Sequence, residues 1–254
     1  MNTNKVKNIM SIEKTLNLIE LMADYGAPIR LQDLADIADM PKATVYRLIN
    51  TLKNKGYVKQ DLSSSRYYLS LKIFSIGTKI SENISINNIS VPFLKKLSEE
   101  CSKSVNFAVV QDNKAIILNI IGGASEAHDI TAKLGSAVPL HCTAIGRSLM
   151  INYDRNMIDK YMSNTPIIKY TPLTTVDSDT LYEKLNNIKT TGFSYDPGEY
   201  RAGIIGISAP ILDQLKNPVA SISIADLASE ITPEEINFLS SKVVNTAKEI
   251  SKII

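Results

Sequence analysis

Seven basic side chains and one acidic side chain fall within residues 40–72, although the chain of 254 residues has a formal net charge of only +2. This stretch reads MPKATVYRLINTLKNKGYVKQDLSSSRYYLSLK. Residues 1–70 together hold ten basic and seven acidic residues, whereas the remainder holds 18 and 19. Such a local excess of positive charge indicates a negatively charged partner but does not determine a fold. The fold must be inferred from the pattern of apolar residues.

Residues 11–40 show the pattern of two short helices. Ser11 is expected to cap the first helix, and its apolar residues recur at steps of three and four. We expect that helix to bury Ile12, Leu16, Ile19 and Ala23. Gly26 and Pro28 should end it. The sequence LQDLADIADM then predicts a second helix with its three Asp side chains in solvent.

A third helix and a hairpin follow. Pro41 suits the first position of a helix, where its missing N–H costs nothing, and Gly56 suits the left-handed residue that follows a helix. The apolar stripe of this helix consists of Val45, Leu48, Ile49 and Leu52. The sequence YVKQDLSSSRYYLSL predicts two strands around a Ser-rich turn. Three short helices and a hairpin predict a winged helix-turn-helix.

The polar face of the third helix is the predicted DNA-binding surface. In this motif the third helix enters the major groove, with phosphate contacts fixing its position and a few base contacts reading the sequence. We expect Tyr46 and Arg47 to reach bases and Thr44 to hold a phosphate together with backbone amides. The predicted DNA-binding residues are Lys42, Thr44, Tyr46, Arg47, Asn50, Lys53, Lys55 and Arg66. The alternative is a solvated helix face that binds nothing.

The rest of the chain predicts an antiparallel sheet with helices, so the whole chain belongs to the α+β class. Strand-like runs are VNFAVVQ, AIILNII, HDITAKL, IIGISAPILD and VASISIAD. Predicted helices are VPFLKKLSEECS, TAIGRSLMI, SDTLYEKLNNIKTTG and one that starts at Pro233.

Two segments of this second part carry polar residues suited to a small ligand. GSAVPLHCTAIG places Thr143 and the amides of Ala144 and Ile145 at a helix amino terminus, which favours an anion such as a carboxylate. DPGEYRAG supplies Asp196, Glu199 and Arg201, and Ser221 and Ser223 share one face of a late strand. Plainer roles stay open: His141 as a loop hydrogen bonder, Asp196 as a turn cap, the serines as ordinary strand hydroxyls and Arg201 as a surface residue.

At these motifs the sequence resembles the IclR family of bacterial transcription regulators. The resemblance rests on SIEKTLNLIELM, LQDLADIADMPKATVYRLINTLKNKGYV, RYYLSLKIFSIG, GSAVPLHCTAIGRSLM, YTPLT, TTGFSYDPGE, ISAPILD and VASISIAD, in that order. It implies a winged helix-turn-helix in residues 1–70, a linker helix in 71–86 and a GAF-like effector-binding domain in 87–254. It also implies a homodimer or tetramer that binds double-stranded operator DNA under the control of a small organic acid.

The resemblance further implies where an effector sits. The resemblance and the motifs above together predict the effector-binding residues Val138, His141, Thr143, Ala144, Ile145, Asp196, Gly206, Ser221 and Ser223. The family often has GVRC before its AAP stretch, whereas this chain reads GIIGISAP, with Ile205 and Gly206 in place of arginine and cysteine. This departure predicts a roomier pocket and a different ligand, such as a sugar acid.

Other classes of function fit the sequence poorly. It contains no G-x-S-x-G, P-loop or H-E-x-x-H motif, so we expect no enzyme and no cofactor. The soft metal ligands His128, His141, Cys101 and Cys142 lack the spacing of a metal site, and both cysteines are expected to be free. A metal-responsive or partner-protein-responsive regulator is the alternative. The absence of a membrane span or signal peptide predicts a cytoplasmic location.

Overall fold

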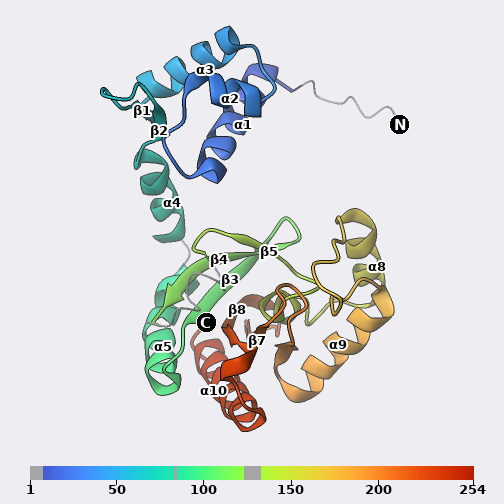
Figure 1. Ribbon diagram of the computed structural model, residues 1–254. Coiled ribbons are helices and arrows are strands. Elements are labelled where there is room, and N and C mark those ends of the chain that lie inside the picture. Colours follow the sequence, from blue (N-terminus) through green and yellow to red (C-terminus); the bar gives the residue numbers. More distant parts are fainter. Residues whose placement is uncertain (1–7, 83–84, 123–132) are drawn as a thin grey trace. The chain divides into compact units, whose positions relative to one another are not determined.

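The computed structural model describes residues 8–82, 85–122 and 133–254, and the chain divides into two compact units, residues 1–83 and 84–254 (Figure 1). We call these the amino-terminal unit and the carboxy-terminal unit. Most of the predicted strand HDITAKL lies outside the described residues. The three-part division predicted from the sequence, with a separate linker helix at residues 71–86, stays a prediction.

The amino-terminal unit is a winged helix-turn-helix followed by one more helix, which confirms the predicted fold. Its elements are α1 (Met10–Tyr25), α2 (Leu31–Ile37), α3 (Lys42–Asn54), β1 (Val58–Gln60), β2 (Tyr67–Leu69) and α4 (Lys72–Glu82). Strands β1 and β2 pair antiparallel and form the wing. As predicted, α3 buries Val45, Ile49 and Leu52, and Gly56 adopts a φ of +79° just after the helix. Pro41 precedes the helix as its N-cap.

The prediction for the first helix was wrong in two respects. The helix begins at Met10, so Ser11 lies inside it and does not cap it. Its buried residues are Leu18 and Met22, whereas Ile12 and Leu16 are 53% and 54% exposed. The helix carries two apolar stripes, and its packing against α2, α3 and β2 decides which one is buried. The other stripe leaves an apolar surface on α1.

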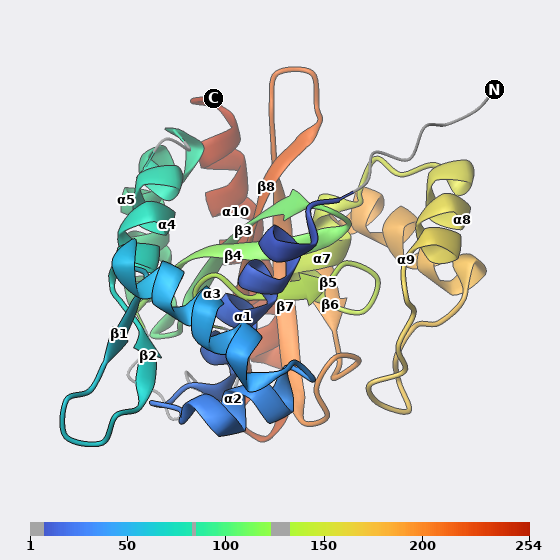
Figure 2. The same cartoon turned by 90° about the horizontal axis from the view of Figure 1, so that it is seen from above.

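The carboxy-terminal unit contains a six-stranded antiparallel sheet with the strand order β5-β4-β3-β8-β7-β6 (Figures 1 and 2). The strands are β3 (Val105–Gln111), β4 (Lys114–Ile121), β5 (Ala137–Pro139), β6 (Ser194–Asp196), β7 (Ile204–Leu212) and β8 (Pro218–Leu227). The predicted antiparallel sheet with helices is therefore confirmed.

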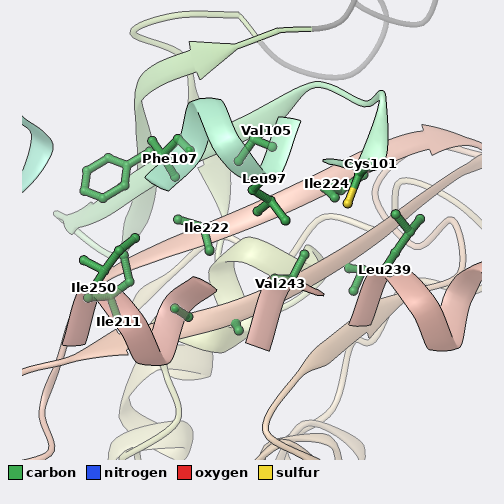
Figure 3. Close-up of a cluster of buried hydrophobic side chains, with 14 of the residues drawn as sticks. Leu97, Cys101, Val105, Phe107, Ile211, Ile222, Ile224, Leu239, Val243 and Ile250 are labelled. Atoms are coloured by element: carbon green, nitrogen blue, oxygen red, sulfur yellow. The ribbon is translucent and has the colours of Figure 1, made fainter. Parts of the chain in front are cut away.

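Helices α5 (Ser85–Cys101) and α10 (Pro233–Ser251) cover one face of this sheet. Figure 3 shows the core between them, where Leu97, Phe107, Ile222 and Val243 meet. Helix α5 begins six residues before the predicted start at Val91 and continues through Pro92. Helix α10 begins at Pro233 as predicted, behind a capping box made by Thr232 and Glu235.

The other face of the sheet carries the short helix α7 (Ala144–Leu149), with α8 (Arg155–Asn164) and α9 (Ser178–Thr191) packed beside each other away from α5 (Figure 2). Strand residues alternate between the two faces. Asn106 therefore points away from the core that contains Phe107. Neighbouring strands pair Asn106 with Ser223, Ser223 with Ser208, and Ser208 with Ser194. A row of polar residues thus crosses four strands on the α7 side.

Candidate effector pocket and DNA-binding face

A pocket lies on the α7 side of the sheet, where the start of α7 meets β3, β6, β7 and β8. It offers about 60 Å³ to the centres of water-sized molecules, several times the ~10–15 Å³ that one water needs. Seven residues predicted from the sequence line it: Val138, Thr143, Ala144, Ile145, Asp196, Gly206 and Ser223. Seven more complete the lining: Asn106, Ile117, Tyr200, Arg201, Ile204, Ile205 and Ala225. The pocket is small and largely apolar, with a few polar groups.

Thr143 is the N-cap residue of α7 and fixes the start of this helix. Its hydroxyl donates to the carbonyl of Pro139 at 2.6 Å and accepts the N–H of Gly146 at 3.1 Å. This is an N-cap interaction. The hydroxyl proton predicted to bind a carboxylate is therefore already used within the loop.

Asp196, at the end of β6, is the acidic side chain of the pocket. It is 7% exposed, and its Oδ1 accepts the N–H groups of Gly198 at 2.9 Å and Glu199 at 2.6 Å. Among the described residues, Oδ2 makes no hydrogen bond. Burial raises the pKa of Asp196 above its usual value, against the opposing effects of those two N–H groups and Arg147. One oxygen thus caps the turn while the other is free for a ligand.

Asn106 and Ser223 add two polar groups on adjacent strands. They form a cross-strand pair between β3 and β8, and both are almost fully buried. Asn106 Oδ1 has no partner in the described part of the chain, an arrangement that costs free energy unless a ligand or water satisfies it. Sequence reasoning missed Asn106, although a polar residue in the apolar run VNFAVVQ is a usable signal.

His141 and Ser221 do not line the pocket. The Nδ1 atom of His141 shares a hydrogen bond of 3.0 Å with the Tyr161 hydroxyl, and burial lowers the pKa of this histidine. Ser221 Oγ lies 2.7 Å from Ser208 Oγ and donates to the carbonyl of Ala209 at 3.2 Å. Both side chains are engaged in internal hydrogen bonds, and Ser221 lies two residues before Ser223 in β8, outside the pocket lining.

A buried ion pair that sequence reasoning missed lies behind the pocket. Arg147 and Glu199 are 1% and 0% exposed, and Arg147 Nη1 lies 2.7 Å from Glu199 Oε1. Arg147 also donates to the Ser194 hydroxyl at 3.3 Å and to the carbonyls of His141 and Tyr195 at 3.2 and 2.6 Å. Helix α7, strand β6 and the loop after β6 are thus joined by one side chain.

Glu199 also accepts hydrogen bonds from Thr175 and Lys184. Lys184 of α9 reaches Oε1 at 2.7 Å, and Thr175 donates to Oε2 through both its N–H and its hydroxyl. Burial alone would raise the pKa of Glu199, but Arg147, Lys184 and Thr175 outweigh it and hold the pKa below its usual value. The network fixes the loop that carries Asp196 and Tyr200 against α7 and α9.

On the amino-terminal unit, all of the predicted DNA-binding side chains are at least partly accessible to solvent. Lys42, Tyr46, Arg47, Lys53 and Lys55 are exposed, and Thr44, Asn50 and Arg66 are half-buried. In residues 8–82, as far as the structure describes them, no lysine or arginine forms an ion pair with an acid. The positive charge of α3 and the wing is therefore available to an external anion.

The described ranges contain neither a cluster of metal ligands nor a helix that could cross a membrane. Within residues 8–82, 85–122 and 133–254, no three His, Cys, Asp or Glu side chains are grouped to hold a metal ion. His128, one of the four soft ligands considered above, lies outside these ranges. Burial raises the pKa of Cys142 to about 12, so its thiol stays protonated. No described helix is long and apolar enough to cross a membrane.

Comparison with known proteins places the two units in one family. The family model for the bacterial transcriptional regulator IclR C-terminal domain matches residues 78–252, and the IclR helix-turn-helix domain matches residues 11–62. The transcriptional repressor IclR of Escherichia coli K12 is 27% identical over 245 residues, which cover 96% of this chain and 89% of that protein.

Two solved structures share the fold. The Thermotoga maritima IclR structure has a TM-score of 0.81 at 22% identity and covers 97% of this chain and 99% of its own. An IclR homologue from Microbacterium hydrocarbonoxydans, complexed with 4-hydroxybenzoate, has a TM-score of 0.78 at 15% identity and covers 96% and 100%. The family-model matches span most of both units, and the chain therefore belongs to the IclR family of bacterial DNA-binding transcription regulators, which are not enzymes.

Proposed function

We propose that this regulator is a repressor whose affinity for operator DNA is set by a small organic or sugar acid bound in the pocket. The observation that carries the proposal is the pocket itself. It is small, is lined mainly by apolar side chains, and includes Asn106, whose Oδ1 has no partner among the described residues, and Asp196, whose Oδ2 bonds to none of them. Similarity to a protein named as a repressor supports the direction of regulation, and the 4-hydroxybenzoate complex of a related fold supports an acid as ligand.

The pocket residues have separate roles in this proposal. Asn106 and Ser223 bind polar groups of the effector, and Asp196 Oδ2 bonds to its hydroxyl or carboxyl group. Val138, Ala144, Ile145 and Gly206 shape the walls, and a Cβ atom added to Gly206 would lie 3.2 Å from Ala144 Cβ. The space that the missing side chain leaves beside Gly206 is therefore limited by Ala144 of α7.

We also propose that two copies pair through their apolar helix faces and act on chromosomal DNA in the cytoplasm. Ile12 and Leu16 on α1 and Phe74 and Ile80 on α4 expose more than half of their surface. Burying such side chains against a second copy is favourable. A dimer also doubles the number of base pairs read, which one winged helix needs for selectivity.

Arg47→Ala is expected to weaken operator binding by about 1–3 kcal/mol if Arg47 reads a base. Lys53→Ala should weaken binding to all DNA alike and reduce the salt slope by about one, because it removes a phosphate contact. Fluorescence anisotropy with an operator selected from a random-sequence library measures both. Lys160→Ala, an exposed lysine of α8, is the matched control.

The same titration tests pairing. At DNA concentrations far above the dissociation constant, binding should saturate at two chains per operator or a multiple of two. Saturation at one chain would contradict the dimer, and unchanged binding by the Arg47→Ala/Lys53→Ala double variant would contradict the assignment of α3.

A further inference from the structure

We infer that an anionic effector binds this pocket together with one proton, which Asp196 holds on Oδ2 and donates to the effector. The inference deepens the proposed function and rests on it, because it requires that the effector is an acid. The proton comes from the buffer, so no other group in the protein changes its charge when the complex forms.

The geometry of Asp196 leaves one oxygen for this role. Oδ1 is occupied by the N–H groups of Gly198 and Glu199, which fix the carboxyl group at the end of β6. Asp196 belongs to the lining of the pocket, and its Oδ2 bonds to none of the described residues. A ligand in this pocket lies beside the Asp196 side chain.

The buried charged groups around Asp196 are already paired and do not neutralise a second negative charge. From α7, Arg147 faces it, but Arg147 already bonds to Glu199, Ser194 and two carbonyls. From the loop after β6 come Glu199, which is negative, and Arg201, an exposed residue at the pocket wall whose guanidinium lies 5.6 Å from the Tyr200 ring centre. Lys184 of α9 is bound to Glu199.

The remaining neighbours of Asp196 are uncharged or do not ionise near neutral pH. The Cys142 thiol, before α7, has its pKa raised to about 12 by burial, and burial also raises the pKa of Tyr195. The lining residues of β3, β7 and β8 are Asn106, Ile204, Ile205, Gly206, Ser223 and Ala225. No buried cation among the described lining residues is therefore free to pair with an effector carboxylate.

Two carboxylates in one cavity repel each other, and one of them then takes up a proton. The protonated Oδ2 converts that repulsion into an O–H···O⁻ hydrogen bond, which is strong because its acceptor is charged. Burial already raises the pKa of Asp196 in the free protein, so the proton is held at little further cost. The buried side of the pocket therefore offers an acid a neutral donor, whereas the cation Arg201 lies at its exposed wall.

The consequence is a pH dependence with a defined sign. Between the pKa of Asp196 in the free protein and its higher value in the complex, affinity for the acid falls tenfold for each unit of rising pH. A neutral ligand of the same shape shows no such slope. In Asp196→Asn the side-chain amide donates its own N–H to the effector carboxylate and takes up no proton from solvent. The acid should therefore still bind, and its affinity should no longer depend on pH.

Isothermal titration calorimetry of the full chain tests the inference with glycolate, the smallest hydroxy acid, and with 4-hydroxybenzoate. Titrations at pH 7 in buffers of different ionisation enthalpy give the number of protons taken up. We expect proton uptake by the parent and by Asp112→Asn, an exposed turn carboxylate, and none by Asp196→Asn. Glycolamide, the neutral counterpart of glycolate, should bind without proton uptake.

The outcomes separate the two claims. An acid that binds the parent without proton uptake overturns this inference and leaves the proposed function standing. Failure of both acids to bind the parent at millimolar concentration overturns both. If Asp196→Asn fails to fold by thermal denaturation, the pH dependence of affinity in the parent decides the matter, because a flat profile contradicts the shared proton.

Discussion

Arg147→Met is expected to lower the free energy of unfolding of the carboxy-terminal unit by about 3–5 kcal/mol, the usual cost of removing one partner from a buried ion pair. The variant leaves Glu199 fully buried with Lys184 as its one remaining cation among the described residues, and Lys184 is itself 34% exposed. It also leaves the Ser194 hydroxyl and the carbonyls of His141 and Tyr195 without the donor they share.

Arg155→Met is the matched control. Arg155 also bridges two acids, Asp159 and Asp179, but it is 44% exposed, and exposed pairs are worth about 0–1 kcal/mol. Chemical denaturation followed by circular dichroism measures both variants. Equal costs for the two would show that the Arg147–Glu199 pair does not stabilise the fold. Combining Arg147→Met with Glu199→Gln should cost less than the sum of the single changes, because the two residues share one interaction.

Gly146→Ala is expected to destabilise the carboxy-terminal unit by about 3 kcal/mol, the upper end of the cost of overpacking. A Cβ atom at this position would lie 2.5 Å from Leu140 Cα, 2.7 Å from the Leu140 carbonyl oxygen and 2.6 Å from Thr143 Oγ1. Two of these atoms are backbone and cannot rotate away. The glycine permits the close approach of α7 to the loop that carries the pocket residues.

Gly77→Ala gives the opposite expectation and serves as the control. Gly77 lies in the exposed helix α4, and a Cβ atom there meets nothing within 4 Å. Alanine in an open helix position should stabilise by about 0.5–1 kcal/mol. The two changes are chemically identical, so thermal and chemical denaturation of each unit compares packing alone. A neutral Gly146→Ala would contradict the close contact with Leu140.

The sequence predicted the amino-terminal unit well wherever one apolar stripe dominates. Helix α3 has a single stripe, so Val45, Ile49 and Leu52 were assigned to the core correctly. Helix α1 has two stripes, and nothing local shows that Leu18 is buried while Leu16 is not. That choice is made by α2, α3 and β2, which contact α1 only in the folded unit.

The pocket shows the same limit for polar residues. Thr143, Ala144 and Asp196 belong to loops with recognisable composition, so the sequence indicated them. Arg147 was missed because its side-chain partners Ser194 and Glu199 lie 47 and 52 positions away in the chain, and periodicity carries no information about such contacts. Ser221 and Ser223 share a strand face, but only the register with β3 and β7 decides that Ser223 reaches the cavity.

The central claim, that an acid in the pocket controls DNA binding, is tested most directly by measuring operator affinity with and without the acid. Fluorescence anisotropy of the selected operator, titrated with the full chain in the presence of saturating glycolate or 4-hydroxybenzoate, gives both constants. A coupling free energy of about 1–3 kcal/mol predicts that the dissociation constant changes by roughly 5- to 150-fold. Identical constants, with the acid shown by calorimetry to be bound, would contradict the claim.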